Sequence, residues 1–190
     1  MKGAFDPGGE SLLISADCPF RILPSVPMSV DQRSFRKTLG CFATGVTVVT
    51  TLHPDTEAPA GVTVSAFSSL SLEPPLVLFC LGLKTSSLSA FQNYGRFAIN
   101  VLAEGQRDLS IRFASRSEDK WGGLKWEKGL GGVPLLPGCL ATLECKLVNA
   151  IEGGDHMIFV GEVENLTHQE GGSPLIYFRG AYLDFPPPVS

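Results

Sequence analysis

The polar run Lys84-Thr85-Ser86-Ser87 has the chemistry of an anion site. It combines an ammonium group and hydroxyl groups with the main-chain N–H groups that have no partner where a helix begins. Such a combination can hold a phosphate dianion, because the N-terminal end of a helix carries a partial positive charge. An ordinary helix N-cap uses the same residue types and is the alternative interpretation.

A second candidate region is the segment 61–75, whose sequence is GVTVSAFSSLSLEPP. Its small hydroxyl residues lie among apolar ones and would leave main-chain N–H and C=O groups accessible to the polar edge of a flat ligand. A serine-rich strand end is the alternative interpretation.

The third candidate is Gly153-Gly154-Asp155-His156. Two glycines permit a tight turn with positive φ, and Asp155 can hold that turn by bonding its own backbone. The imidazole of His156 would then project from a fixed edge, although a structural or solvated histidine is the plainer reading. Nearer the C-terminus, Arg179 and Tyr182 are either an interface pair or a ligand clamp.

Motifs of several other functional classes are missing from the sequence. It has no Gly-x-Gly-x-x-Gly after a strand, no Walker lysine motif and no Gly-x-Ser-x-Gly elbow. The three histidines are scattered, which argues against a metal site. With 15 Lys and Arg against 19 Asp and Glu, the net charge of −4 argues against nucleic acid. The longest apolar stretch, 76–83, is far shorter than the ~20 residues that cross a bilayer, so we expect no membrane partner.

Strands predominate among the elements that must position these residues, and 21 Gly and 14 Pro argue against long helices. The β-branched run 46–51 predicts a buried strand, and 141–147 alternates strictly, which predicts one wet and one packed face. Other predicted strands are 60–67, 76–81, 97–102, 156–166 and 174–183. One predicted helix begins near Ser29 or Asp31 and has Phe35, Leu39 and Phe42 at helical spacing. Two others begin at 84 and 104, and 121–138 is predicted to be a long loop. This order favours a mainly β fold, an antiparallel barrel with flanking helices.

We expect a mobile N-terminal extension over 1–29, one domain over 30–185 and a short tail over 186–190. The five cysteines are odd in number and form no Cys-x-x-Cys pair, and Cys41, Cys80 and Cys145 lie in apolar patterns typical of core residues. The first thirty residues lack the basic start and long apolar run of a signal peptide. These features predict a cytoplasmic protein without a disulfide framework.

Five segments in order resemble the short-chain flavin reductases with an FMN-binding split barrel, which serve two-component monooxygenases. The matching segments are 35–50, 61–75, 97–102, 154–163 and 174–182, and the resemblance as a whole covers roughly 29–185. The resemblance implies a homodimer of antiparallel split β-barrels with flavin near the subunit interface. It also implies hydride transfer from NADH or NADPH to FMN, with FAD as the alternative, and diffusion of reduced flavin to a partner monooxygenase.

The resemblance also assigns site residues. The flavin ring and ribityl chain would lie against Thr63, Val64, Ser65, Ala66, Phe67, Ser69 and Leu70. The phosphate would be held by Lys84, Thr85 and Ser86, with Phe113 and Ala114 completing that side. His156 would face the nicotinamide as the catalytic residue, with Arg36, Arg179 and Tyr182 as neighbours. The family often has Asn at the position of Ser65 and varies around Lys84, which bears on the choice between FMN and FAD.

Two other functions stay open at this point. One is an oxidoreductase or oxygenase that retains its flavin and acts on an organic substrate. The other is a non-catalytic flavin-binding electron carrier.

Overall fold

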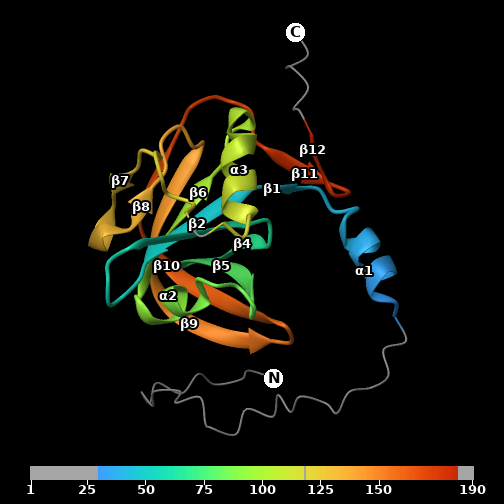
Figure 1. The fold of residues 1–190 in the computed structure, drawn as a ribbon, viewed down its shortest axis with the longest axis horizontal. Helices are drawn as coiled ribbons and strands as arrows, with labels where there is room; N and C mark the ends of the chain where they lie inside the picture. Colours follow the sequence, from blue (N-terminus) through green and yellow to red (C-terminus); the bar gives the residue numbers. More distant parts are fainter. Residues whose placement is uncertain (1–29, 118, 184–190) are drawn as a thin grey trace, which may run out of the picture.

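A computed structural model describes residues 30–117 and 119–183 of the 190-residue chain. The central sheet has seven antiparallel strands in the order β3-β2-β6-β9-β10-β5-β4 (Figure 1). Their bounds are β2 Thr47–Leu52, β3 Pro59–Val64, β4 Phe67–Leu72, β5 Pro75–Gly82, β6 Arg96–Val101, β9 Ala141–Gly153 and β10 His156–His168. The predicted mainly β, antiparallel architecture with flanking helices is confirmed. The expected N-terminal extension and C-terminal tail lie outside the described residues.

The two ends of this sheet are consecutive in the sequence. Strands β3 and β4 are separated only by Ser65 and Ala66, where the chain exchanges β2 for β5 as its partner. We call this junction the corner. The corner links the two edges of the sheet through the chain itself, and β3 and β4 do not pair with each other in the described ladders. The predicted strand 60–67 is therefore wrong in extent, because pairing continues to Leu72 on a new partner.

Aromatic side chains fill the interior of the barrel. Phe79 on β5 stacks on Phe159 of β10 at a centroid distance of 5.0 Å, and its ring meets the edges of Phe97 at 5.0 Å and Phe91 at 5.8 Å. All four rings are almost fully buried. Strand β2 is buried along its whole length, as the β-branched run predicts.

A second apolar layer lies between β2 and helix α3, Arg107–Ala114, which follows the 3-10 turn η1, Glu104–Gln106. Phe113 is fully buried in this layer, and Leu109, one turn earlier, packs against it. The predicted helix 104–114 is confirmed. Helix α2, Leu88–Asn93, begins four residues later than the predicted start at Lys84.

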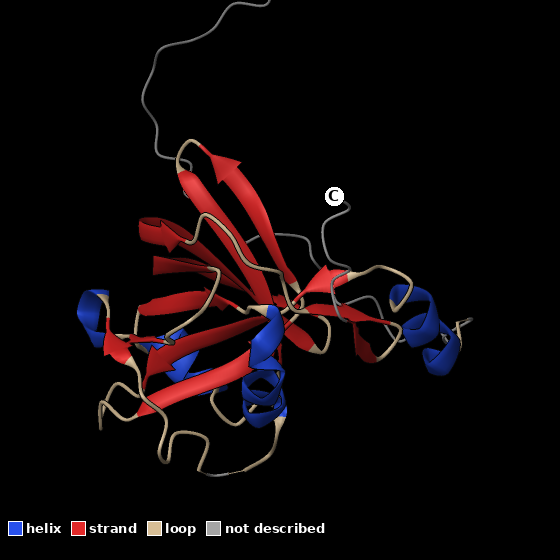
Figure 2. Cartoon of the chain, turned by 90° about the horizontal axis from the view of Figure 1, so that it is seen from above, coloured by secondary structure: helices blue, strands red, loops and turns tan. Residues whose placement is uncertain are grey.

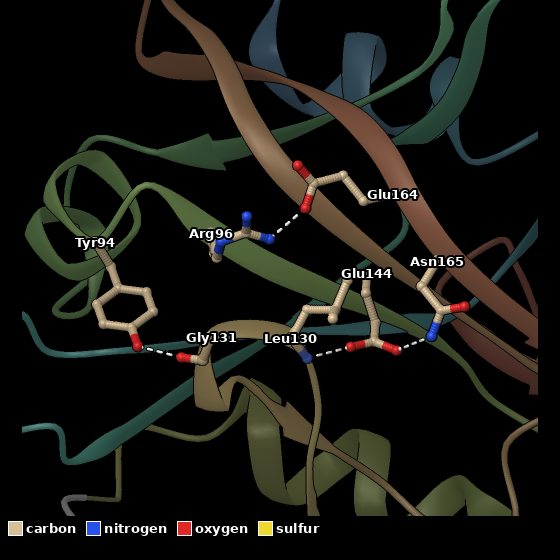
Figure 3. Close-up of polar contacts among 7 residues, drawn as sticks. All are labelled: Tyr94, Arg96, Leu130, Gly131, Glu144, Glu164 and Asn165. Atoms are coloured by element: carbon tan, nitrogen blue, oxygen red, sulfur yellow. Dashed lines mark hydrogen bonds and ion pairs between the residues drawn. The ribbon is translucent and has the colours of Figure 1, made fainter.

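The face of β9 that we expected to be wet is covered instead. Thr142 and Glu144 are buried, because the segment with β7 (Glu127–Lys128), η2 (Leu130–Gly132) and β8 (Pro134–Leu135) lies over them. The Glu144 carboxylate accepts hydrogen bonds from Leu130 N and, at 2.6 Å, from Asn165 Nδ2 (Figure 3). Beside it Arg96 pairs with Glu164, and the Tyr94 hydroxyl donates to the Gly131 carbonyl. These bonds stabilise a polar layer at a position where strand alternation predicts solvent.

A small sheet and helix α1 extend from one side of the barrel (Figure 1, Figure 2). The sheet contains β1 (Thr44–Gly45), β11 (Ile176–Phe178) and β12 (Ala181–Leu183) in the order β1-β11-β12. The predicted single strand 174–183 is a hairpin, because Arg179 and Gly180 turn the chain with φ of 50° and 83°. Its turn is bonded to the end of α1 by Arg179 N, which donates to Gly40 O at 2.9 Å.

Helix α1, Gln32–Leu39, has the predicted Asp31 cap, whose Oδ2 accepts from Ser34 N at 2.8 Å. None of its residues is buried. Cys41, which follows the helix, is exposed, and the prediction that it is a core residue is wrong. The apolar spacing identifies a face of the helix, but none of the residues that the structure describes buries that face.

Candidate functional site

The corner exposes main-chain groups to solvent. Ser65 and Ala66 are exposed. Among the described residues they take part in one main-chain hydrogen bond, from Cys80 N to Ala66 O at 3.0 Å. The remaining N–H and C=O groups of these two residues can bind the polar edge of a flat ring. This is the property expected of the 61–75 segment.

Helix α3 covers one side of β3 and fixes its position. Thr63 Oγ1 donates to Ser110 O at 2.6 Å, and a β-carbon at Gly61 would lie 2.6 Å from a Phe113 ring atom. Glycine at position 61 therefore permits the close approach of strand and helix. Val64 is 4% exposed and Phe113 0%, so their side chains belong to the core. A ligand at the corner can meet Val64 only through its main chain, and Phe113 can only support β3 from behind.

Strand β4 forms the other side of the corner. Ser69 is exposed, Leu70 is half-exposed, and Phe67 is half-buried against the barrel core. The pairing with β5 shifts register between Ser69 and Ser71, which leaves Leu70 without a partner across the ladder. The bulge gives this wall both an exposed hydroxyl and an exposed apolar side chain.

The expected phosphate residues occupy a tight turn between β5 and α2. Lys84 and Ser86 are exposed and Thr85 is half-buried. Two N–H groups at this turn already donate locally: Thr85 N to Gly82 O at 2.9 Å and Leu88 N to Thr85 O at 3.1 Å. Helix α2 is six residues long, so it adds little dipole. Anion binding here depends on side chains more than on the helix start.

A groove beside this turn contains cations that the sequence analysis missed. It is lined by residues from the β2–β3 connection, the start of β3, the turn before α2 and the segment after α3: His53, Pro59, Ala60, Gly61, Ser86, Ser87, Arg116, Ser117, Lys120 and Trp121. Arg116 and Lys120 belong to no motif in the sequence. The available signal was their position directly after Phe113-Ala114, which the resemblance had placed beside the phosphate. Ala114 itself is exposed and does not line the groove.

His156 begins β10 after a two-residue turn, in which Gly154 has φ of 70° as the Gly-Gly pair predicts. Asp155 Oδ1 lies 2.7 Å from His156 Nδ1, and Leu83 N donates to Asp155 O at 2.9 Å. His156 pairs across the ladder with Gly82, and its Nε2 lies near that glycine. The bond from His156 is the main cause that lowers the pKa of the Asp155 carboxyl, with the imidazole charge second. Asp155 thus orients the imidazole while Nε2 stays available next to the 83–87 turn.

The other three residues expected near the nicotinamide have their own contacts away from the His156 ring. Arg36 and Arg179 line a hollow of about 480 Å³ at the end of α1. Tyr182 packs on α3, where its hydroxyl lies 2.8 Å from Ser110 Oγ and the Arg107 guanidinium lies 5.2 Å from its ring centre. Within one chain these residues form two groups, and His156 is a third position. Arg36 is close enough to the Asp155 carboxylate to favour its charged form.

Two general properties of the described residues bear on the chemistry. No group of three or more His, Cys, Asp or Glu side chains among them is arranged to hold a metal ion. Over the same residues, no helix combines the length and the apolar character needed to cross a bilayer.

Comparison with known proteins identifies the family of the chain. The family described as "Flavin reductase like domain" matches residues 39–186. An FMN reductase (NADH) of Agrobacterium fabrum is 46% identical over 160 residues, covering 84% of this chain and 90% of that protein. The reductase subunit of a flavin-dependent monooxygenase of Mycobacterium tuberculosis is 42% identical over 160 residues, covering 83% and 84%. The solved structure of an NADH:FAD oxidoreductase of Streptomyces globisporus, in complex with NAD and FAD fragments, superposes with a TM-score of 0.78 at 37% identity, covering 84% and 96%. The chain therefore belongs to the flavin reductase-like family.

Proposed function

We propose that this chain is a flavin reductase, which uses NADH to reduce a flavin that then serves a partner monooxygenase. The observation that carries the proposal is the corner, where Ser65 and Ala66 offer free main-chain groups between two strand edges. A flat ring can lie there against the backbone without displacing any core side chain. The names of the relatives supply the reaction that such a ring would undergo.

The flavin would contribute a ring whose N5 accepts hydride from C4 of the nicotinamide. The protein's own part is to hold two rings in register and to exclude water between them. Main-chain groups of Ser65 and Ala66 would bind the polar edge of the flavin, and Leu70 would shield it. His156, oriented by Asp155, would bind the nicotinamide through Nε2 from across the 83–87 turn.

The partner is inferred from the relatives. Several are named as reductase subunits or components of flavin-dependent monooxygenases. Since the proposed ring site is at an exposed corner, reduced flavin can leave it without opening the barrel core. That position supports transfer of the flavin by diffusion.

We also propose that the chain forms a homodimer through α1. Phe35, Leu39 and Phe42 are 54%, 57% and 78% exposed, and α1 projects from the barrel (Figure 1). A contiguous apolar face of this kind is typical of an interface. Leu70 and Leu72 on β4 are exposed apolar residues as well. A partner subunit over α1 would give Arg36 and Arg179 neighbours beyond those that the described residues supply.

The test is turnover with each flavin and each nicotinamide. The purified protein is mixed with FMN or FAD and with NADH or NADPH, and loss of the nicotinamide absorbance is followed. We expect NADH oxidation that depends on added flavin. No oxidation with any of the four pairs would overturn the proposal.

A variant pair separates binding of the two substrates. His156→Ala should raise the KM for NADH about tenfold or more while flavin affinity stays unchanged. His168→Ala is the matched control, because His168 is exposed at the far end of the same strand. A carrier without reductase activity would show tight flavin binding and no response to either variant.

A further inference from the structure

A hollow beside β7 has no residue in common with the proposed flavin surface. It encloses about 400 Å³, within the ~300–1,000 Å³ range of small-molecule sites. None of its residues forms the corner, and none lines the groove beside the 83–87 turn. We call it the β7 hollow, and it is lined by Leu52, Glu57, Tyr94, Trp126, Lys128, Gly131 and Gly132.

The apolar part of the β7 hollow is held in place by contacts outside it. Leu52, at the end of β2, is 5% exposed. The Tyr94 hydroxyl donates to the Gly131 carbonyl, which ties the phenol ring to η2 (Figure 3). Trp126 is half-buried and meets the ring of Trp121 edge-on at a centroid distance of 6.0 Å. Two rings that are already fixed can contact an apolar ligand at little cost in conformational entropy.

Glycine at position 132 keeps the β7 hollow open. A β-carbon there would lie 3.4 Å from Leu52 Cδ1 and 3.9 Å from the Tyr94 hydroxyl oxygen. Gly132 has φ of 79°, a conformation that favours glycine over other residues. The residue that the η2 turn requires is therefore also the one that leaves the space between Leu52 and Tyr94 unfilled.

Two side chains of opposite charge complete the lining. Trp126 and Lys128 are two residues apart at β7, and strand alternation places both on one face, whereas Glu127 lines other hollows. Glu57 belongs to the β2–β3 connection. Among the described residues, the ion pairs involve neither Glu57 nor Lys128, and neither side chain has a hydrogen bond. Each can therefore bind a ligand group of the opposite charge.

We propose that the β7 hollow binds a free α-amino acid with an apolar side chain. The Glu57 carboxylate would bind the ammonium group of the ligand, and the Lys128 ammonium would bind its carboxylate. The rings of Tyr94 and Trp126 would contact the apolar side chain. A ligand with a single charge would leave one of the two charged residues without a partner, whereas a zwitterion uses both. This ligand class contains neither flavin nor nicotinamide, so the site does not depend on the proposed reduction of flavin.

The test uses L-phenylalanine as the probe. Phenylacetate and phenethylamine are analogues that each lack one of its two charges. Isothermal titration calorimetry on the full chain measures the three Kd values. We expect a Kd of about 1 mM or tighter for L-phenylalanine and binding about fivefold weaker for each analogue.

Substitutions at the two charged residues assign the contacts. Glu57→Gln and Lys128→Gln should each weaken L-phenylalanine about fivefold, the size of one exposed ion pair. Glu57→Gln should not weaken phenylacetate, because that analogue has no ammonium group. Glu73→Gln and Lys146→Gln are the matched controls, since both residues are exposed and neither lines the β7 hollow. Tm values confirm that each variant is folded.

The two tryptophans of the chain locate the bound ligand. Trp126 lines the β7 hollow and Trp121 does not. L-Phenylalanine should therefore change the indole fluorescence of the wild type. Trp126→Phe should remove most of that change while the emission of Trp121 remains.

Each outcome supports or overturns the proposal. Absence of L-phenylalanine binding up to about 10 mM would overturn it, as would equal affinity for either analogue. Unchanged Kd values in both Glu57→Gln and Lys128→Gln would place the ligand elsewhere and overturn it as well. If the wild type binds L-phenylalanine as expected but oxidises no NADH with any flavin, the proposed function fails while the assignment of the β7 hollow stands.

Discussion

The barrel interior and helix α1 both carry aromatic and aliphatic side chains at regular spacing, yet their environments are opposite. Phe79 and Phe159 are fully buried and stacked, whereas Phe35 in α1 and Phe42 just after it are more than half exposed. The first cluster is completed by strands of the same chain, and the second has no cover within the described residues. Apolar spacing thus identifies a packing face, but it does not say which chain will cover it.

The largest expected effect on stability comes from removing an aromatic ring from the barrel core. Phe79→Ala removes a ring that contacts three others, and we expect the free energy of unfolding to fall by about 3–5 kcal/mol. Urea denaturation measures this. Phe42→Ala, just after the end of α1, is the control at an exposed ring and should change protomer stability little. Equal losses in both variants would mean that α1 packs on the barrel.

An intermediate effect is expected at α1. Leu39→Asp places a charge on the exposed apolar face and should weaken dimer association by about thirtyfold or more, which is the size of a ~2 kcal/mol interface hot spot. Analytical ultracentrifugation over a concentration series measures this change. Barrel stability should stay near the wild-type value. A wild-type protein that is monomeric at every concentration would contradict the dimer.

The smallest effect concerns the start of α1 and depends on pH. The Ser34 N–H bond lowers the pKa of the Asp31 carboxyl below its ordinary 3.8. Since the folded-state pKa is the lower one, the cap is fully effective above pH 3.8 and is lost as pH falls through the lowered value. Exchange of the Ser34 amide should therefore quicken in strong acid.

Asp31→Asn is the control for this effect, because a neutral amide caps a helix without titrating. That variant should show no such acid step. An acid step of the same size in both proteins would assign it to another group.

The sequence predicts those parts of the fold that local pattern determines. The β-branched run 46–51 indicates a buried strand, and Leu109 and Phe113 indicate the packed face of α3, because period and side-chain type suffice there. Glu144 was expected in solvent since the segment that covers it arrives from elsewhere in the chain. The bend at Ser65 was missed because the apolar alternation continues through it while the partner strand changes.

The same limit applies to the site. The hydroxyl-rich segment 61–75 and the glycine turn before His156 can be predicted from the sequence, because each is one continuous segment. Arg116 and Lys120 were missed because only the fold brings them beside Ser86 and Ser87. Conversely, the resemblance grouped Tyr182 with Arg179, which lies only three residues away but faces a different surface once the hairpin has turned.

The corner between β3 and β4 affects the order in which parts of the protein can fold during synthesis. The pairing partners of β3 and β4 are β2 and β5, which are their neighbours in the sequence. The continuous segment 47–82 therefore contains all four strands at the corner, and these two pairings need no distant strand. His156 reaches Gly82 only after β10 has been added, across a long separation in sequence. Loop closure of that length slows pairing. On an emerging chain the surface proposed for the flavin can therefore assemble well before the residue proposed for the nicotinamide.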